Sequence, residues 1–187
     1  MHRIIERVGP CKMTYYTPEF QNLARSIVYQ QLNGSAAATI FGRLRMAAKQ
    51  DPLTPESVLR LRATTLRKAG LSAQKASYIR DLAQKTLSGE VDFLKLPSMA
   101  DDEVIQHLTR VKGIGVWTVQ MLLMFGLQRE DVLPTADFGI RKSMMNAFEL
   151  EEMPKPAEME QIAQPWQPYR TVACWYLWRF LDSKAGF

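Results

Sequence analysis

Cysteine and histidine are scarce in this 187-residue sequence, which contains two of each. Cys11 and Cys174 cannot build a disulfide framework. With only His2 and His107 beside them, they form no recognisable zinc or iron–sulfur motif. We therefore expect chemistry that requires no cofactor and no iron–sulfur cluster.

Long apolar runs are also missing. The stretch 116–127 is interrupted by Gln120 and is too short to span a bilayer. The N-terminus lacks the hydrophobic core of a secretory signal. These absences predict an intracellular protein without a membrane partner, located in the cytoplasm or nucleoid, or in the nucleus of a eukaryote.

The composition is that of a folded, basic protein. Apolar residues make up 47% of the chain, and 24 Lys and Arg against 19 Asp and Glu give a net charge of +5 and a pI near 9.3. This balance suits a polyanionic partner, although many ordinary proteins share it. We expect one compact, monomeric unit over 1–187, divided into two lobes.

Helix start signals recur along the chain, and no alternating strand pattern competes with them. Thr17-Pro18-Glu19 predicts a helix over about 18–32, because an N-cap residue, a first-turn proline and an early carboxylate precede an apolar stripe. The fold class is therefore all-α, with roughly ten short helices. Further starts or ends are predicted at Asn33-Gly34-Ser35, Thr54-Pro55-Glu56, Gly70-Leu71-Ser72, Pro97-Ser98, Gly126, Asp137 and Trp166.

A tight hairpin is predicted at Lys112-Gly113-Ile114-Gly115, between two helical segments. Two glycines permit a sharp turn, and Ile114 can anchor it in the core. Backbone N–H groups at the start of the next helix can then receive a DNA phosphate, and Lys112 can add charge. For an isolated G-x-G, a plain helix C-cap is the commoner interpretation.

The residues around the hairpin resemble the 3-methyladenine DNA glycosylase II family, of the AlkA-like type, within the helix-hairpin-helix glycosylase superfamily. The resemblance extends over about 17–180, and the larger bacterial members have an additional N-terminal β-domain that it does not include. The motifs that carry it are Val111 to Thr118, Asp131 to Asp137, Ser26 to Leu32, Gly70 to Ala76 and Trp166 to Arg170.

This resemblance implies two helical lobes that flank a DNA-binding cleft. One lobe would comprise 1–34 and about 150–187, and the other about 35–149 with a helix-hairpin-helix at 101–126. It also implies that the carbonyls of Thr109, Val111 and Ile114 hold Na⁺ or K⁺ at the hairpin.

The resemblance further assigns roles to individual side chains. Gln31 would wedge into the duplex, and Trp117 and Trp178 would line the base pocket, with Trp175, Tyr176 and Tyr16 as further candidates. Without the resemblance, aromatics at helical spacing are more often core residues, and Gln31 is a polar helix end. Isolated cations are usually only solvated, but three are candidate phosphate contacts: Lys75, Arg141 and Lys142.

Asp137 is the predicted catalytic carboxylate. Cleavage of an N-glycosidic bond develops positive charge on the sugar, which a fixed carboxylate stabilises. An N3- or N7-alkylated purine is already cationic and leaves without a second carboxylic acid. By local sequence alone, Asp137 could equally be only an N-cap.

These features together predict a monofunctional glycosylase that flips 3-methyladenine- or 7-methylguanine-type bases out of double-stranded DNA and leaves an abasic site. By the resemblance, lyase-type relatives carry a nucleophilic lysine where this sequence has Trp117. Two alternatives stay open at this point. One is a non-enzymatic helix-hairpin-helix DNA-binding module, and the other is a glycosylase for oxidised or mismatched bases.

Overall fold

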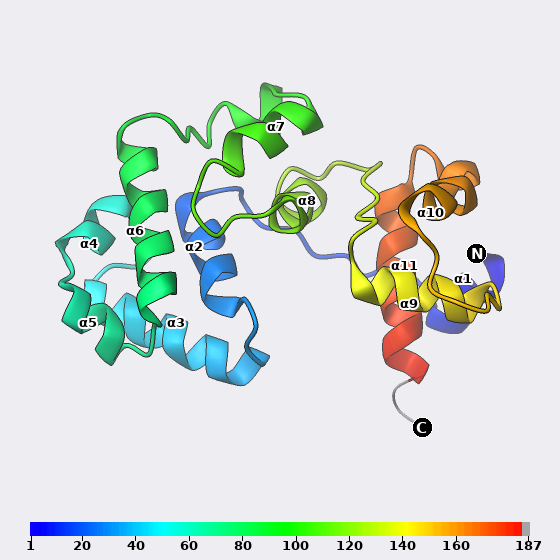
Figure 1. The fold of residues 1–187 in the computed structure, drawn as a ribbon, viewed down its shortest axis with the longest axis horizontal. Helices are drawn as coiled ribbons and strands as arrows, with labels where there is room; N and C mark the ends of the chain where they lie inside the picture. The colour runs from blue at the N-terminus through cyan, green and yellow to red at the C-terminus, as the bar shows by residue number, and fades with distance from the viewer. Residues whose placement is uncertain (185–187) are drawn as a thin grey trace. The chain divides into compact units, whose positions relative to one another are not determined.

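The computed structural model describes residues 1–184, and the regular secondary structure of that range is entirely helical (Figure 1). The prediction of an all-α fold is therefore confirmed for the described chain. None of the helices within residues 1–184 combines the length and apolar character that a membrane crossing needs.

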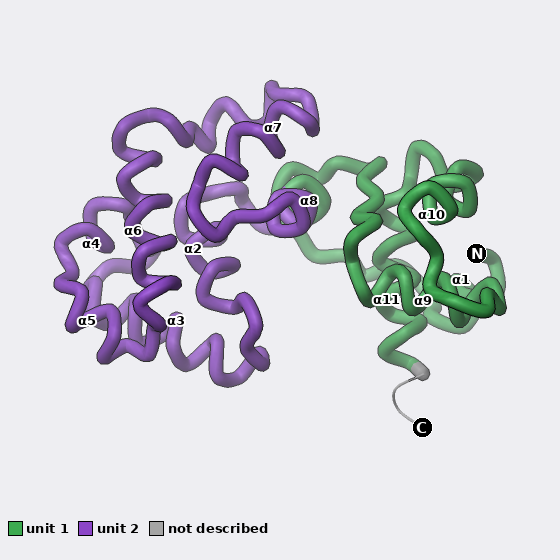
Figure 2. The backbone as a smooth tube through the Cα atoms, in the orientation of Figure 1, with its two compact units in different colours: residues 1–15, 123–187 green, residues 16–122 purple. Residues whose placement is uncertain are grey.

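The chain divides into two compact units (Figure 2). Unit 1 comprises 1–15 and 123–187, unit 2 comprises 16–122, and the boundary lies within α8 (Val116–Phe125). Unit 2 contains α2 (Phe20–Tyr29), α3 (Gly34–Ala48), α4 (Pro55–Arg60), α5 (Ala63–Lys68), α6 (Ala73–Leu87), η1 (Leu96–Ser98) and α7 (Asp101–Leu108). Unit 1 contains α1 (His2–Val8), α9 (Phe138–Ala147), α10 (Pro156–Ala163), η2 (Gln164–Trp166) and α11 (Arg170–Lys184).

These units differ from the two predicted lobes in their boundaries. Residues 16–34 belong to unit 2 and 123–149 to unit 1, the reverse of the predicted division. The reason is packing, since α2 lies against α6, and α9 lies against α11. Each helix buries its apolar stripe on that neighbour, and sequence proximity does not determine which neighbour it is.

Several predicted helix starts are confirmed by side-chain caps. Asn33 accepts from the Ala36 N–H at the start of α3, and Ser72 accepts from the Lys75 N–H at the start of α6. Thr54 and Ser57 form a reciprocal capping box at α4. These caps are local, so four consecutive residues are enough to predict each of them.

Other boundaries were predicted wrongly. Pro97 and Ser98 form the separate turn η1, and α7 starts at Asp101, where the Glu103 carboxylate accepts from the Ala100 N–H at 2.8 Å. Trp166 ends η2, and α11 starts only after Pro168, whose ring disfavours helix in the residue before it. The helices α1 and α10 were not predicted.

Each unit has its own apolar core. The largest fully buried side chains of unit 2 include Leu23, Ile27, Leu44, Leu66, Ile79, Leu82, Leu96 and Leu108. In unit 1, the buried apolar residues include Ile4, Ile140, Met144, Met159, Cys174 and Leu177. Ile140 and Met144 lie on α9 and Cys174 and Leu177 on α11, two helices that pack against each other and carry the carboxylate described next.

Candidate functional site

Asp137 is the N-cap residue of α9 and is buried, with 8% of its surface exposed. Its Oδ1 accepts a hydrogen bond from the Ile140 N–H at 2.8 Å. The Asp137 N–H donates to the Pro134 carbonyl at 3.0 Å, which fixes the turn that leads into the helix. The predicted N-cap role is therefore confirmed, and the carboxylate is held rigidly at the helix start.

A second donor reaches the same carboxylate oxygen from α11. The Trp178 indole Nε1–H donates to Asp137 Oδ1 at 3.0 Å, and the Trp178 ring lies 6.0 Å from the Phe125 ring, centroid to centroid. Gly139 makes this approach possible, because a Cβ there would lie 3.1 Å from Trp178 Cδ1 and 3.2 Å from Asp137 Oδ1. Trp178 therefore orients the carboxylate, a role that the sequence did not indicate.

The loop before Asp137 is tied to the start of α11. The Arg170 guanidinium donates to both carboxylate oxygens of Asp131, at 2.7 and 2.8 Å. The Thr171 hydroxyl donates to the Arg129 carbonyl at 2.6 Å and accepts from the Val132 N–H at 3.0 Å. A bidentate guanidinium–carboxylate pair restricts geometry as well as adding energy. The same helix thus holds the loop at Arg170 and the carboxylate at Trp178.

We expect the Asp131–Arg170 pair to make stability depend on pH. Hydrogen bonds from Arg170 hold the pKa of Asp131 below its usual range. A lowered pKa in the folded state contributes stability that is present above the unfolded value, near 4, and is lost as pH falls through the folded value. Asp131→Asn should therefore lower the free energy of unfolding at pH 7 by up to about 1 kcal/mol, since solvent screens this partly exposed pair.

Urea unfolding of both proteins at pH 7 and at pH 3 measures this effect. The difference between wild type and Asp131→Asn should shrink at the lower pH, where the wild-type carboxyl begins to bind a proton and comes to resemble the amide. An equal difference at both pH values would show that the charge of Asp131 contributes nothing.

The predicted hairpin is formed by residues of unit 2, at the connection between α7 and α8. Gly113 has φ +78°, and a Cβ on it would lie 2.0 Å from Cδ2 of the Tyr78 ring. Its carbonyl accepts from Gln30 Nε2 at 2.8 Å, and Ile114 is buried, as predicted. Only glycine satisfies both the positive φ and the close ring contact at position 113.

The N–H groups of the hairpin differ in their partners. The Lys112 N–H donates to the Asp81 carboxylate at 2.9 Å and the Ile114 N–H to the Val111 carbonyl at 3.1 Å. Within residues 1–184, the N–H groups of Gly113 and Gly115 have no protein acceptor. A Cβ on Gly115 would meet nothing within 4 Å. The hairpin therefore offers two N–H groups to an external acceptor at the beginning of α8.

The hairpin and Asp137 both lie within the range of a known family. The family model described as HhH-GPD superfamily base excision DNA repair protein matches residues 24–168. The chain belongs to the HhH-GPD superfamily. The family resemblance inferred from the sequence is confirmed by this match and by the relatives below.

One curated relative and two solved structures illustrate what this HhH-GPD chain is similar to. DNA-3-methyladenine glycosylase 1 of Schizosaccharomyces pombe is 32% identical over 95% of this chain and 80% of the relative. The crystal structure of a Bacillus halodurans DNA-3-methyladenine glycosidase has a TM-score of 0.89 and 36% identity, and the match covers 99% of this chain and 85% of that one. The S. pombe 3-methyladenine DNA glycosylase Mag1 in complex with abasic DNA has a TM-score of 0.81 and 34% identity, covering 95% and 89%.

The predicted pocket aromatics of the HhH-GPD chain are divided between the units. Trp117 on α8 and Tyr16 belong to unit 2; Trp117 is 47% exposed, and burial raises the pKa of Tyr16. Trp175 and Trp178 belong to α11 in unit 1, where Trp175 packs edge-on against the buried Tyr176 at 5.0 Å between centroids. Among these aromatic residues, Trp178 donates the hydrogen bond to Asp137 described above.

The predicted DNA-contacting side chains also have distinct environments. Gln31 is exposed two residues after the end of α2, and its backbone is in the left-handed region with φ +56°. Lys75 Nζ donates to the Val28 and Gln30 carbonyls at 2.7 and 2.6 Å, and Arg141 Nε donates to the Pro154 carbonyl at 3.1 Å. The head groups of Lys75 and Arg141 thus bind the chain's own carbonyls, and burial lowers the pKa of Lys75.

Several residues that shape the site were not identified from the sequence. Gln30 was included only within the motif Ser26 to Leu32, and Gly139, Tyr78 and Asp81 were not singled out. Each acts on a residue far away in the chain, so no local pattern marks it. A small residue two positions after Asp137 is the one available signal, because glycine inside a helix suggests a close approach.

Proposed function

We propose that this protein is a monofunctional DNA glycosylase that hydrolyses the N-glycosidic bond of alkylated purines in double-stranded DNA. The observation that carries the proposal is the buried Asp137 carboxylate, held by the Ile140 N–H and the Trp178 indole. Relatives named DNA-3-methyladenine glycosylase, which align with nearly the whole chain, support this choice of reaction.

The chemistry assigned to Asp137 is stabilisation of the sugar cation. As the bond from C1′ to the base nitrogen breaks, positive charge develops on the sugar, and a preorganised carboxylate lowers the energy of that state. The bonding electrons leave with the purine, which is cationic beforehand and becomes neutral. Water then attacks C1′ and loses a proton, so one carboxylate is sufficient.

Base recognition is assigned to the aromatic side chains Trp117, Trp178, Trp175 and Tyr16. An extruded cationic purine gains cation–π attraction on an electron-rich ring, whereas an undamaged neutral purine does not. The exposure of Trp117 supports its role as a stacking surface. Trp178 is assigned two tasks: its N–H orients Asp137, and its partly exposed side chain is assigned to stacking.

DNA docking is assigned to the hairpin and to Gln31. The N–H groups of Gly113 and Gly115 would receive a phosphate without reading the base sequence, and Gln31 would fill the space left by the extruded base. The carbonyls of Thr109, Val111 and Ile114 are assigned to a bound Na⁺ or K⁺. They are neutral oxygen donors in a tight turn, and Val111 O, which accepts the Ile114 N–H, has a second lone pair.

Incubation with duplex DNA carrying 7-methylguanine or 3-methyladenine tests the proposed reaction. We expect release of the free base, an intact abasic strand and no covalent adduct after borohydride treatment, because Trp117 leaves no amine at the position of the lyase lysine. Release of neutral oxidised bases instead, or a trapped adduct that disappears when one lysine is replaced, would contradict the assignment.

A further inference from the structure

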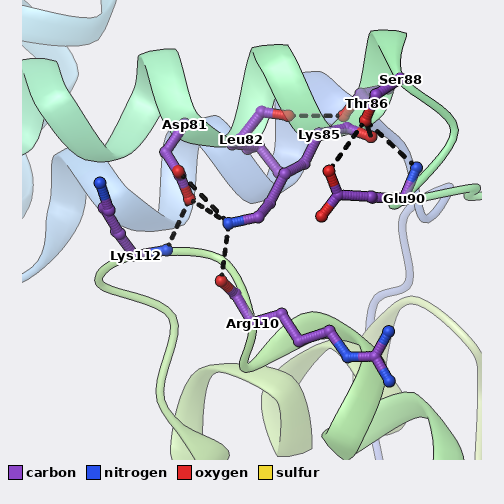
Figure 3. A network of polar contacts seen from close by, with 8 residues as sticks. All are labelled: Asp81, Leu82, Lys85, Thr86, Ser88, Glu90, Arg110 and Lys112. Atoms are coloured by element: carbon purple, nitrogen blue, oxygen red, sulfur yellow. Dashed lines mark hydrogen bonds and ion pairs between the residues drawn. The ribbon is translucent and has the colours of Figure 1, made fainter.

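One face of α6 is directed at the hairpin. Three side chains on this face contact the hairpin or the residues just before it. Tyr78, Asp81 and Lys85 are spaced by three and four residues, which places them along one side of the helix. The Tyr78 ring covers Gly113, as described above. Asp81 and Lys85 bind the hairpin backbone through hydrogen bonds (Figure 3).

Asp81 provides an acceptor for a hairpin donor. Its Oδ2 accepts the Lys112 N–H at 2.9 Å and the Lys85 ammonium at 3.0 Å. The side chain is only 14% exposed. Burial raises the pKa of Asp81, but the hydrogen bonds from the Lys112 N–H and Lys85 outweigh that effect and hold it below its ordinary value. The carboxylate is thus ionised at neutral pH and paired on both sides.

Lys85 provides a donor for a backbone acceptor just before the hairpin. Its Nζ donates to the Arg110 carbonyl at 2.9 Å while it also binds Asp81 (Figure 3). The two α6 side chains therefore satisfy one N–H and one C=O of the same short connection, residues 110–112. Backbone groups without a partner would leave that segment free to adopt other conformations.

These hydrogen bonds also determine which backbone N–H groups of the hairpin are available to a DNA phosphate. Asp81 accepts the Lys112 N–H, and within residues 1–184 the hairpin N–H groups of Gly113 and Gly115 are left without a protein acceptor. A negative carboxylate so near the hairpin would repel a phosphate if its charge were not compensated, and Lys85 compensates it. Asp81 and Lys85 have to act together for this arrangement to favour DNA.

We propose that Asp81 and Lys85 are positioning residues for DNA binding, which hold the hairpin backbone in the conformation that presents Gly113 and Gly115 to a phosphate. This inference rests on the proposed function, because it assumes that the hairpin docks DNA. Neither side chain contacts the DNA itself in this arrangement. Their removal should weaken binding of damaged and undamaged duplexes equally, since the phosphate carries no base information.

The test uses Asp81→Ala, Asp81→Asn, Lys85→Ala and the double alanine variant of the full chain. Each alanine variant should raise the Kd for an undamaged duplex and for an abasic-analogue duplex about tenfold, the loss expected for a charge-assisted hydrogen bond. KM for base release should rise likewise, with kcat at saturating DNA within about twofold of wild type. Asp81→Asn, which retains an oxygen for the Lys112 N–H, should recover part of the affinity.

Three further readouts separate positioning from other roles. Amide hydrogen exchange at Lys112 should accelerate in Asp81→Ala while the core of α6 keeps its protection. The Kd of the double variant should be about the same as that of the weaker-binding single variant. Each single variant already loses the same conformation of the hairpin backbone, so the two losses should not add. In Lys85→Ala, the slope of log Kd against log salt concentration should change by much less than about 0.9, the change expected when one phosphate contact is lost.

The matched control is Lys95→Ala, which removes a 68% exposed lysine that pairs with Asp92 at 3.4 Å elsewhere in unit 2. It should leave Kd within about twofold of wild type. If Asp81→Ala does not fold, Lys85→Ala carries the same test. Wild-type affinity in Asp81→Ala and Lys85→Ala would overturn the proposal, as would additive losses or a salt slope reduced by a whole contact.

Failure of the proposed function would look different. If the wild-type protein binds DNA but releases no alkylated base, the glycosylase assignment fails while the binding and exchange measurements still judge Asp81 and Lys85. If base release is normal and the variants bind as wild type, the positioning role fails alone.

Discussion

Asp137→Asn is expected to lower the rate of base release from alkylated DNA by about 100- to 1,000-fold, the range seen when one preorganised charge-stabilising group is removed. The variant keeps an oxygen at the place of Oδ1, so the bonds from the Ile140 N–H and the Trp178 indole can persist. What it loses is the negative charge that the proposed function places beside the developing sugar cation. The loss should therefore appear in kcat rather than in folding.

Binding should separate from catalysis in this variant. Affinity for an abasic-analogue duplex should stay within a few-fold of wild type, because the carboxylate acts on the transition state more than on the ground state. Asp182→Asn is a suitable control, since it makes the same chemical change at an exposed position of α11 paired with Arg179 at 3.2 Å. Single-turnover base release and fluorescence anisotropy measure the two properties. Near-normal turnover in a folded Asp137→Asn protein would remove Asp137 from the catalytic role.

Gly113→Ala is expected to destabilise the protein by about 2 to 4 kcal/mol and to weaken binding of all duplex DNA by at least about tenfold. Two costs combine at this position. The positive φ disfavours any side chain, and the new methyl would lie 2.0 Å from the Tyr78 ring, so the ring or the hairpin must move. Either movement disturbs the N–H groups offered to the phosphate.

Two glycines of unit 2 provide controls that separate these costs. Gly89 has the same φ of +78°, but a Cβ at that position would meet nothing within 4 Å, so Gly89→Ala reports strain alone, about 1 kcal/mol. Gly115 has neither a positive φ nor a neighbour within 4 Å, so Gly115→Ala should leave stability near wild type. Any loss of DNA affinity in Gly115→Ala then reports the approach of the phosphate itself.

Thermal unfolding and anisotropy with an undamaged duplex check this set of variants. The order of stability should be wild type and Gly115→Ala, then Gly89→Ala, then Gly113→Ala. Unchanged affinity in both hairpin variants would show that DNA docks elsewhere. A Gly113→Ala protein as stable as wild type would mean that the ring contact with Tyr78 costs nothing to rearrange.

Local signals account for the parts of the fold that were predicted correctly. The caps at Asn33, Thr54, Ser72 and Asp137 each bond to an N–H three residues ahead, so the residues involved are neighbours in the sequence. The turn at Gly113 is likewise local. The family pattern around these two features then located the candidate site, because Asp137 and the hairpin lie within one continuous stretch.

Local sequence signals did not predict the boundaries of the two units or the contacts between residues far apart in the chain. The division into units depends on which helix α2 and α9 pack against, and an apolar stripe does not specify its partner. The lysine at position 75 illustrates the same limit for side chains. Its charge suggested a phosphate contact, yet its Nζ binds carbonyls 45 and 47 residues away.

The sequence by itself therefore determined the helical class, the hairpin, the carboxylate at the start of α9 and the family. The tertiary structure alone decided what holds these parts in place: Trp178 on Asp137, Arg170 on Asp131, and the α6 side chains on the hairpin. The physical reason is distance along the chain. A helix cap is formed by residues close together in the sequence, whereas these contacts join residues 25 to 41 positions apart, and only the packing of whole helices brings them together.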